Sequence, residues 1–477
     1  MTDELARLDA TAQAELVRSG DVTPSELVDA AIERIEAIDP TLNAVIHRRF
    51  EKAREEVRSA DLADGPFRGV PFLVKDAVCH TAGDPYHCGS RFLKEIGFRA
   101  DHDTELARRF RAAGFVFVGK TNTPEFALSA TTEPLAYGAT RNPWNTDHSP
   151  GGSSGGSGAA VAAGLVPVAH GNDMGGSIRI PATYCGLVGL KPTRARNSLG
   201  PDLGEYWGPF THEHVLTRSV RDTAAVLDAT AIRAPGDPYK APPPARPWAQ
   251  EVGADPGTLR IGFTTSGGRG RDAHPECVAA VESAARLLEE LGHRVEPVEI
   301  TALAAPMPGF GVISSATVAR DLEIWAKRIG REVGEDDIEP MNWNMAQAGR
   351  RLSAAEYIAA LADVYAYARG VEAWWEEGWD VLLTPTSASL PAKIGELAPL
   401  REPAELMPGL AAATTFTMPF NTTGQPALSL PLHTSSDGLP VGVQLVGAYA
   451  REDLLVRLAS QLEQACPWAD RRPPVHA

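Results

Sequence analysis

The chain has 477 residues, 44 of them glycine and 38 proline, and a formal net charge of −16. Its 43% hydrophobic and 22% charged residues are typical of a globular protein, and the acidic balance argues against a nucleic-acid partner or an anionic membrane surface. Five scattered cysteines, no long apolar run and an acidic start without signal-peptide features predict a cytoplasmic protein with no disulfide framework and no membrane partner.

Strand and helix signals alternate along the first part of the chain. Residues 23–26 (Thr-Pro-Ser-Glu) have the pattern of a capping box, so we expect a helix there that ends at Pro40. Short apolar runs at 69–74 and 115–118 predict buried strands, with a helix over 104–113 between them. This alternation predicts an α/β fold with a largely parallel sheet.

Two glycine-rich loops bracket a short segment with a predicted helix and strand over 159–169. Residues 149–158 are almost entirely small, and Gly-Gly-Ser recurs at 175–177. A flexible linker would have this composition, but both flanks look folded. Because glycine lets a backbone approach a ligand closely, the loops indicate a site around Ser153 and Ser177.

The rest of the chain alternates in the same way around one irregular region. Seven prolines between residues 233 and 257 predict an extended surface excursion. Beyond it we expect strands at 259–263, 380–384, 427–432 and 441–446, and helices at 277–291, from Ser353 onward and at 454–465.

Residues 114–121 (Gly-Phe-Val-Phe-Val-Gly-Lys-Thr) satisfy the P-loop pattern letter for letter. In a P-loop the intervening residues form a turn that cradles phosphate, and a helix follows. Here they are apolar and typical of a strand, and Pro124 lies where that helix would run. An NTPase acting through Lys120 is therefore a disfavoured alternative.

Three further patterns are weak. Residues 152–156 match the nucleophile elbow G-x-S-x-G, but a loop rather than a strand precedes them. The pairs Cys79-His80 and His87-Cys88 lack a standard zinc spacing, and residues 212–214 (His-Glu-His) do not form a zinc-helix pattern. We therefore expect no metal, and a polar loop with buried thiols around residues 79–88.

Amide hydrolysis needs a nucleophile, a base and donors for the tetrahedral oxyanion. Ser153 and Ser177 are candidate nucleophiles. Lys75 follows the apolar residues 72–74, where burial would lower its pKa and make it a base. Taken alone, Lys75 is more typical of a solvated strand end, and the two serine loops favour the catalytic interpretation.

The chain resembles the amidase signature family of serine hydrolases in several ordered blocks. They are residues 69–76 (GVPFLVKD), 119–126 (GKTNTPEF), 149–157 (SPGGSSGGS), 175–182 (GGSIRIPA), 185–193 (CGLVGLKPT), 420–427 (FNTTGQPA) and 438–444 (GLPVGVQ). The resemblance implies an α/β fold with a large twisted mixed β-sheet covered by helices on both faces. It implies a single domain over 1–477, with a catalytic core at about 65–195, the excursion at 233–257 and a variable substrate region at about 305–345.

Family residues can be carried over position by position. The resemblance implies a Ser–cis-Ser–Lys triad in which Ser177 is the nucleophile and Ser153 relays its proton to neutral Lys75. Asp173 and Arg179 are expected to brace the loop. The implied oxyanion hole consists of the backbone N–H groups of Met174, Gly175, Gly176 and Ser177.

The substrate region is less well matched. The resemblance to the amidase signature family also implies that Ala127, Leu128 and Ser129 line the acyl side of the site. Residues 172–174 (Asn-Asp-Met) depart from the Thr-Asp-Thr of many members and resemble the branch that includes hydrolases of nylon oligomers. Residues 200–214 and 305–345 carry aromatic and methionine side chains that suit a bulky apolar or aryl amide, with ordinary core packing as the open alternative. Tyr206 and Trp207 are the expected substrate contacts in the first of these regions.

The resulting hypothesis is an amidase that needs no cofactor and hydrolyses aryl or alkyl amides, amide oligomers or carbamates (urethanes) through an acyl-enzyme on Ser177. The expected partner is a small-molecule amide or carbamate, with a homodimer as the candidate assembly. The alternative is the amidase component of a tRNA-dependent glutamine amidotransferase, which the charge of −16 disfavours.

Overall fold

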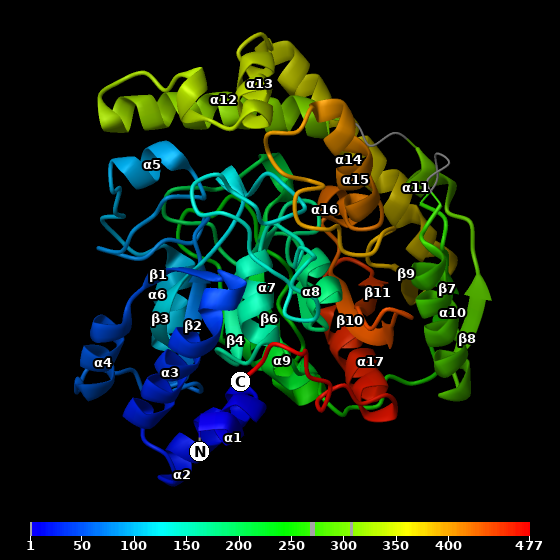
Figure 1. Cartoon of the computed structure of the whole chain (residues 1–477). Helices are drawn as coiled ribbons and strands as arrows, with labels where there is room; N and C mark the ends of the chain where they lie inside the picture. The colour runs from blue at the N-terminus through cyan, green and yellow to red at the C-terminus, as the bar shows by residue number, and fades with distance from the viewer. Residues whose placement is uncertain (1, 268–271, 306–308) are drawn as a thin grey trace.

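One 11-stranded sheet organises the part of the chain that the computed structural model describes, residues 2–267, 272–305 and 309–477. The strand order is β1-β3-β2-β4-β6-β5-β10-β11-β9-β7-β8 (Figure 1). The strands are β1 (Val45–Arg48), β2 (Pro71–Lys75), β3 (Val116–Thr121), β4 (Val168–Asp173), β5 (Val188–Lys191), β6 (His212–Thr217), β7 (Arg260–Phe263), β8 (Arg294–Pro297), β9 (Val381–Pro385), β10 (Ala427–Thr434) and β11 (Pro440–Gly447).

The sheet is mixed, as the resemblance implied, and the expectation of a largely parallel sheet is wrong. β2 pairs in parallel with β3 and β4, and β7 with β8 and β9. The pairings among β4, β6, β5, β10, β11 and β9 are antiparallel, as is that of β1 with β3. The tight turn between β10 and β11, in which the Gly438 N–H donates to the Ser435 carbonyl (2.9 Å), allows only antiparallel pairing.

Helices cover both faces of this sheet (Figure 1). The α-helices are α1 (Thr2–Arg7), α2 (Ala10–Ser19), α3 (Pro24–Leu42), α4 (Phe50–Arg58), α5 (Arg91–Glu95), α6 (Glu105–Ala112), α7 (Gly155–Ala162), α8 (Arg179–Cys185), α9 (Val220–Thr230), α10 (Pro275–Glu290), α11 (Thr301–Ala304), α12 (Phe310–Ile329), α13 (Pro340–Gly349), α14 (Ala354–Glu372), α15 (Pro403–Thr414), α16 (Met418–Thr423) and α17 (Glu452–Ala465). Short 3₁₀ helices are η1 (Glu125–Ala127), η2 (Gly208–Phe210), η3 (Trp248–Glu251), η4 (Glu335–Asp337) and η5 (Ala373–Glu377).

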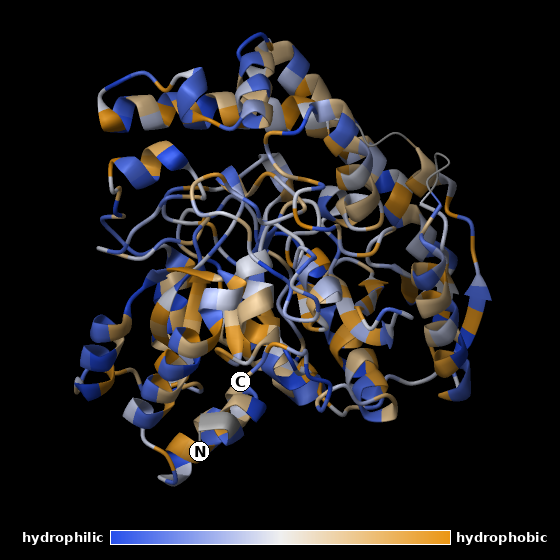
Figure 2. Cartoon of the chain, in the orientation of Figure 1, coloured by the Kyte–Doolittle hydropathy of each residue, from blue (hydrophilic) through white to orange (hydrophobic). Residues whose placement is uncertain are grey.

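The alternation of side chains along β2 sets the position of its last residue. Phe72 and Val74 pack with Phe110 of α6 on one face of the sheet, whereas Leu73 packs into the cluster formed by α3, α7 and α8 on the other. Successive side chains of a strand point to opposite faces. Lys75 therefore shares the face of Leu73 and points toward α7. Figure 2 shows these central strands as predominantly apolar.

Two helices form a cap over the loops at the carboxyl ends of β2 and β4, and a third packs beside them. In Figure 1, α12 and α13 lie above these loops, on the side away from α1 and α2, and α14 runs from them past α16 toward α11. Ile313 and Trp325 of α12 belong to the same apolar cluster as Met174 and Trp207 below them. The cap accounts for most of the predicted variable region at 305–345, of which residues 306–308 lie outside the described structure.

Local sequence signals located most elements correctly. The capping boxes at Thr23 and Ser353 are both present. The expectation that Pro40 ends the first helix is wrong, because α3 continues to Leu42. Pro40 sits in the last turn, where its missing N–H gives up one helical hydrogen bond, but the helix continues past it until Asn43 closes it in the left-handed conformation with its N–H bonded to the Asp39 carbonyl.

The proline-rich excursion is partly anchored rather than fully extended. It contains η3, in which Trp248 is buried. Asp237 accepts a hydrogen bond from the Ser198 hydroxyl (2.8 Å), which ties the excursion to the loop that leads to η2. Within the described residues, no helix combines the length and the apolarity needed to cross a membrane.

Candidate active site

Lys75 ends β2 with its side chain completely buried. Its Nζ atom lies 2.6 Å from Ser153 Oγ, 3.0 Å from Ser154 Oγ and 2.6 Å from Asn172 Oδ1. Ser153 and Ser154 immediately precede α7, and Asn172 is the next-to-last residue of β4. The carboxyl ends of the parallel strands β2 and β4 thus meet the amino end of α7 at one point.

In two of these three contacts, those with Asn172 and Ser154, the partner's oxygen must accept a hydrogen bond from Lys75. Asn172 Nδ2 donates to the Ala77 carbonyl (3.0 Å), so Asn172 Oδ1 faces Lys75 and accepts. The Ser154 hydroxyl donates to the Asn172 carbonyl (3.2 Å), so its oxygen also accepts from Lys75. A neutral amine has two N–H groups and one lone pair. With both N–H groups used in this way, the lone pair of neutral Lys75 faces Ser153 Oγ.

Burial favours this neutral form. Desolvation lowers the pKa of Lys75 to about 7, against the opposing effects of the Glu213 and Asp173 carboxylates. Near neutral pH a substantial fraction of Lys75 is therefore uncharged and able to accept a proton.

Ser177 lies in the loop between β4 and α8 and contacts the loop that carries Ser153 and Ser154. The Ser154 N–H donates to the Ser177 carbonyl (3.3 Å), which joins the two serine loops directly. The Gly152–Ser153 peptide bond is cis. Ser177 is 8% exposed, whereas Ser153 and Lys75 are fully buried. Ser177 is thus the member of this group that solvent and a ligand can reach.

A buried ion pair holds the Ser177 loop. Asp173 accepts from Arg179 Nη2 (2.8 Å) and Nε (2.9 Å), and both side chains are completely buried. Arg179 lowers the pKa of Asp173 despite its burial. Asn421 donates to the Asp173 carboxylate (2.8 Å) and accepts from Arg179 Nη2 (2.6 Å). Asp173 and Arg179 therefore have the bracing contacts expected of them.

The predicted oxyanion hole needs one correction. The Gly176 N–H donates to Asp173 Oδ1 (2.8 Å), so this amide is directed into the protein and not toward a ligand. Gly176 has φ +136°, and a Cβ there would lie 2.4 Å from Thr417 Oγ1, so only glycine fits. Met174, Gly175 and Ser177 keep the expected role as a proposal.

Four of the five predicted substrate contacts gather in one apolar cluster next to this loop. Ala127, Leu128, Tyr206 and Trp207 all pack in the cluster that contains Met174. The fifth, Ser129, is not part of this cluster and lies beside the Ser153 loop, with its carbonyl oxygen 2.7 Å from the position of a Cβ on Gly152. The Tyr206 hydroxyl donates to Asp321 of α12 (2.7 Å). This hydrogen bond links the apolar wall formed by Tyr206 and Trp207 to the cap.

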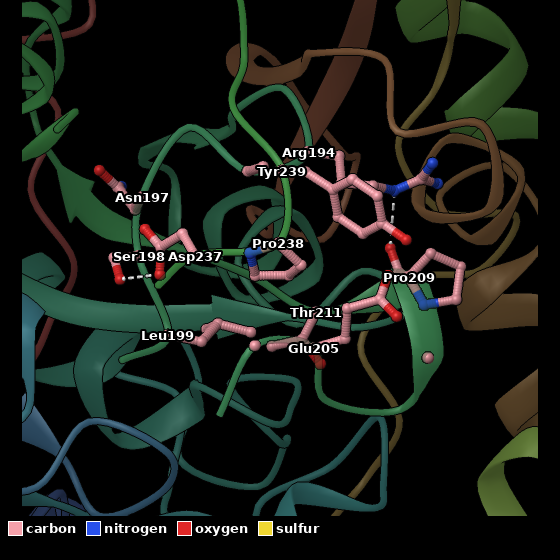
Figure 3. A pocket seen from close by; sticks show the side chains of 13 residues that line it. Arg194, Asn197, Ser198, Leu199, Glu205, Pro209, Thr211, Asp237, Pro238 and Tyr239 are labelled. Atoms are coloured by element: carbon pink, nitrogen blue, oxygen red, sulfur yellow. Dashed lines mark hydrogen bonds between the residues drawn. The ribbon is translucent and has the colours of Figure 1, made fainter. Parts of the chain in front are cut away.

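The far side of the Tyr206 loop borders a separate polar pocket. Arg194, Asn197, Glu205, Asp237 and Tyr239 line it together with backbone of the loop (Figure 3). Neither Ser177 nor Lys75 is among its lining residues. Residues 237–239 of the proline-rich excursion line this pocket opposite Gly204 and Glu205 of the loop.

The alternative motifs do not form the sites they imitate. Residues 116–121 of the P-loop pattern are strand β3, and Lys120 is buried 3.4 Å from Asp76. The two Cys–His pairs do not converge: Cys79 lies with His170 and Glu213 in the interior, and His80 joins a different cluster.

Sequence reasoning missed several side chains that hold the site. They are Ser154, Asn172, Thr417, Asn421 and Gln444, which contact Lys75, Asp173, Arg179 or the Gly175 carbonyl. Ser154, Asn421 and Gln444 lie within the sequence blocks that resemble the amidase signature family. The resemblance therefore singled out these positions but did not indicate which residues they contact.

Comparison with known proteins agrees with this geometry. The family model described as Amidase matches residues 26–456. A 6-aminohexanoate-cyclic-dimer hydrolase of Paenarthrobacter ureafaciens is 48% identical, over 98% of this chain and 96% of that protein. A solved structure of 6-aminohexanoate cyclic dimer hydrolase superimposes with a TM-score of 0.95, at 48% identity, over 98% of this chain and 99% of the other. A solved bacterial aryl acylamidase is more distant, with a TM-score of 0.86 at 26% identity, over 98% of this chain and 99% of the other.

The chain belongs to the amidase family, in its amidase signature group. It is a hydrolase that acts on carbon–nitrogen amide bonds.

Proposed function

We propose that the enzyme hydrolyses amide bonds through an acyl-enzyme on Ser177, with Ser153 and Lys75 as its proton relay. The observation that carries this proposal is the fully buried Lys75 Nζ, 2.6 Å from Ser153 Oγ and surrounded by acceptors that leave its lone pair toward that oxygen.

The proposed proton path uses the contact of Lys75 with Ser153 and adds a transfer from Ser177 to Ser153. Ser177 Oγ attacks the amide carbonyl and passes its proton to Ser153, whose own proton moves to the Lys75 amine. The amides of Met174, Gly175 and Ser177 stabilise the negative charge on the carbonyl oxygen. When the tetrahedral intermediate collapses, the C–N bond breaks and the relay returns a proton to the leaving amine. Water then attacks the ester by the same path and frees Ser177.

For the substrate we propose an oligomer of 6-aminohexanoate, cyclic or linear. The support is the 48% identity to 6-aminohexanoate-cyclic-dimer hydrolase over nearly the whole of both chains, together with the apolar wall formed by Tyr206 and Trp207. Aryl and alkyl amides and carbamates remain candidate substrates. We also propose a cytoplasmic location, since all five cysteines are free thiols, which suits a reducing compartment.

One substrate panel tests both parts of the proposal. Cyclic and linear 6-aminohexanoate dimers, an anilide, an alkyl amide, a carbamate, an ester and glutamine are assayed with the wild type and with Ser177→Ala. We expect turnover of the dimers, and a loss of about 10⁴-fold or more in Ser177→Ala. Turnover of anilides but not of dimers would overturn the substrate, and wild-type rates in Ser177→Ala would overturn the mechanism. Preferred glutamine hydrolysis would favour the amidotransferase alternative.

A further inference from the structure

A cluster of two histidines and one aspartate lies outside the site described above. His80 Nε2 and His102 Nε2 lie 2.9 Å and 3.0 Å from the same atom, Asp202 Oδ2. The three potential ligand atoms are all within 4.8 Å of one another. His80 follows β2, His102 precedes α6, and Asp202 belongs to the loop that leads to η2. Three segments far apart in the sequence therefore converge on one point.

The remaining nitrogens of the two imidazoles are already assigned. His80 Nδ1 is 2.9 Å from the His102 carbonyl, which can only accept, so this nitrogen carries the proton. His102 Nδ1 is 2.6 Å from the Asp101 carboxylate, which also accepts. A neutral imidazole has a single N–H. In the neutral rings, both Nε2 atoms then direct lone pairs at the same carboxylate oxygen of Asp202. A cation placed among these three atoms would be coordinated by all of them.

We propose that His80, His102 and Asp202 form a binding site for a first-row divalent metal ion, with Zn²⁺ the best match. Two imidazole nitrogens and a carboxylate oxygen are a ligand set that suits zinc and its neighbours and not Mg²⁺ or Ca²⁺. Ligands at zinc distances of roughly 2.0–2.2 Å lie about 2.9–3.4 Å apart at angles between 90° and tetrahedral. The observed separations of 2.9 Å and 3.0 Å fall in this range.

The surroundings supply the two other features of a metal site. Metal-binding histidines usually donate their second ring N–H to a carbonyl or a carboxylate, and here the His102 carbonyl and Asp101 fill these places. The side chains of His102 and Asp202 are 40% and 33% exposed, which leaves a path for entry and room for water as a further ligand. This inference departs from our expectation of a metal-free chain, which rested on local spacing. The ligands here are 22 and 100 residues apart.

The ion would act on the architecture of the substrate region and not on the chemistry at Ser177. Asp202 is four residues before Tyr206, and a cavity of about 140 Å³ lined by His80, Asp202, Tyr206 and Asp321 lies between the cluster and the cap. A bound ion would fix the Tyr206 loop to the catalytic core through His80 and His102. We therefore expect metal binding to raise the unfolding temperature of the enzyme.

The test is a titration of full-length, chelator-stripped enzyme with Zn²⁺ in competition with a chromophoric chelator. We expect one equivalent to bind to the wild type and to His433→Asn, a control that breaks another His–carboxylate pair (3.2 Å to Glu276). His102→Asn and Asp202→Asn should each lose about 100-fold or more in affinity. Asp101→Ala, which removes a partner and no ligand, should lose about 10- to 100-fold.

Equal affinity in the wild type and in Asp202→Asn would overturn the proposal, and would leave protonation of both imidazoles as the explanation of the cluster. X-ray absorption on zinc-loaded wild type gives a second readout that does not depend on the folding of variants. Two imidazole nitrogens with oxygen ligands support the site, and sulfur ligation would overturn it.

Discussion

Asn172 Oδ1 accepts a hydrogen bond from Lys75 Nζ at 2.6 Å, at the point where the ends of β4 and β2 come together. This contact occupies one N–H of the amine and Ser154 occupies another, so that the lone pair of neutral Lys75 faces Ser153. Two side chains with no chemical role of their own thereby orient the proposed base.

The first prediction concerns the dependence of activity on pH. Burial lowers the pKa of Lys75 to about 7, and the proposed mechanism needs the uncharged amine. As pH falls through this pKa, Lys75 gains a proton and kcat/KM should fall, approaching about tenfold per pH unit. A profile measured on a stable amide substrate that stays flat down to pH of roughly 5 would contradict Lys75 as the base.

Asn172→Asp should move this acid limb to higher pH. The substitution places a carboxylate where an amide oxygen lies 2.6 Å from Lys75 Nζ, and a negative charge at that distance favours the ammonium form. At neutral pH the variant should lose activity and recover it in alkaline buffer. An unchanged limb, with folding verified by circular dichroism, would show that Lys75 does not govern the profile.

Glu213→Gln should move the acid limb of the pH profile to lower pH. Glu213 is the carboxylate that opposes the lowering of the Lys75 pKa most strongly, and it lies on β6 opposite Asn172. Glutamine removes the charge while it keeps a polar group for His170, which lies 3.0 Å away. The expected result is a lower apparent pKa in the profile of kcat/KM, and a shift upward would refute the electrostatic account.

Much of this site could be predicted from the sequence because its parts are local. Lys75 ends an apolar run, Ser153 and Ser177 sit in glycine-rich loops, and each motif is continuous. The other two partners of Lys75, Ser154 and Asn172, were not predictable in this way. Asn172 is 97 residues from Lys75, and only the pairing of β2 with β4 brings the two together.

The same difference between local sequence signals and contacts set by tertiary structure explains the wrong predictions. The local alternation of strands and helices indicated a parallel sheet, but strand direction is set by the connections, and β10 and β11 form a hairpin. Pro40 was expected to end the helix because a proline inside a helix costs a hydrogen bond. The helix instead ends where Asn43 adopts the left-handed conformation, three residues later. The cluster of His80, His102 and Asp202 likewise depends on tertiary structure alone.

Loss of the buried ion pair should unfold the Ser177 loop and destabilise the enzyme. Arg179→Ala leaves the Asp173 carboxylate buried without its partner, which typically costs about 3–5 kcal/mol. Chemical denaturation measures this loss. The control is Arg331→Ala, which breaks a bidentate pair with Asp337 on the surface and should change stability little. Equal effects of the two substitutions would contradict a bracing role for Arg179.

The most direct measurement is to trap the acyl-enzyme by acid quench during turnover and locate the acyl group by mass spectrometry. Tryptic digestion leaves both serines in the peptide 142–179, and cyanogen bromide cleavage after Met174 then separates Ser153 from Ser177. The account predicts the acyl mass on the fragment that carries Ser177, and its absence from Ser177→Ala. An acyl group on the Ser153 fragment, or its persistence in Ser177→Ala, would contradict the central claim.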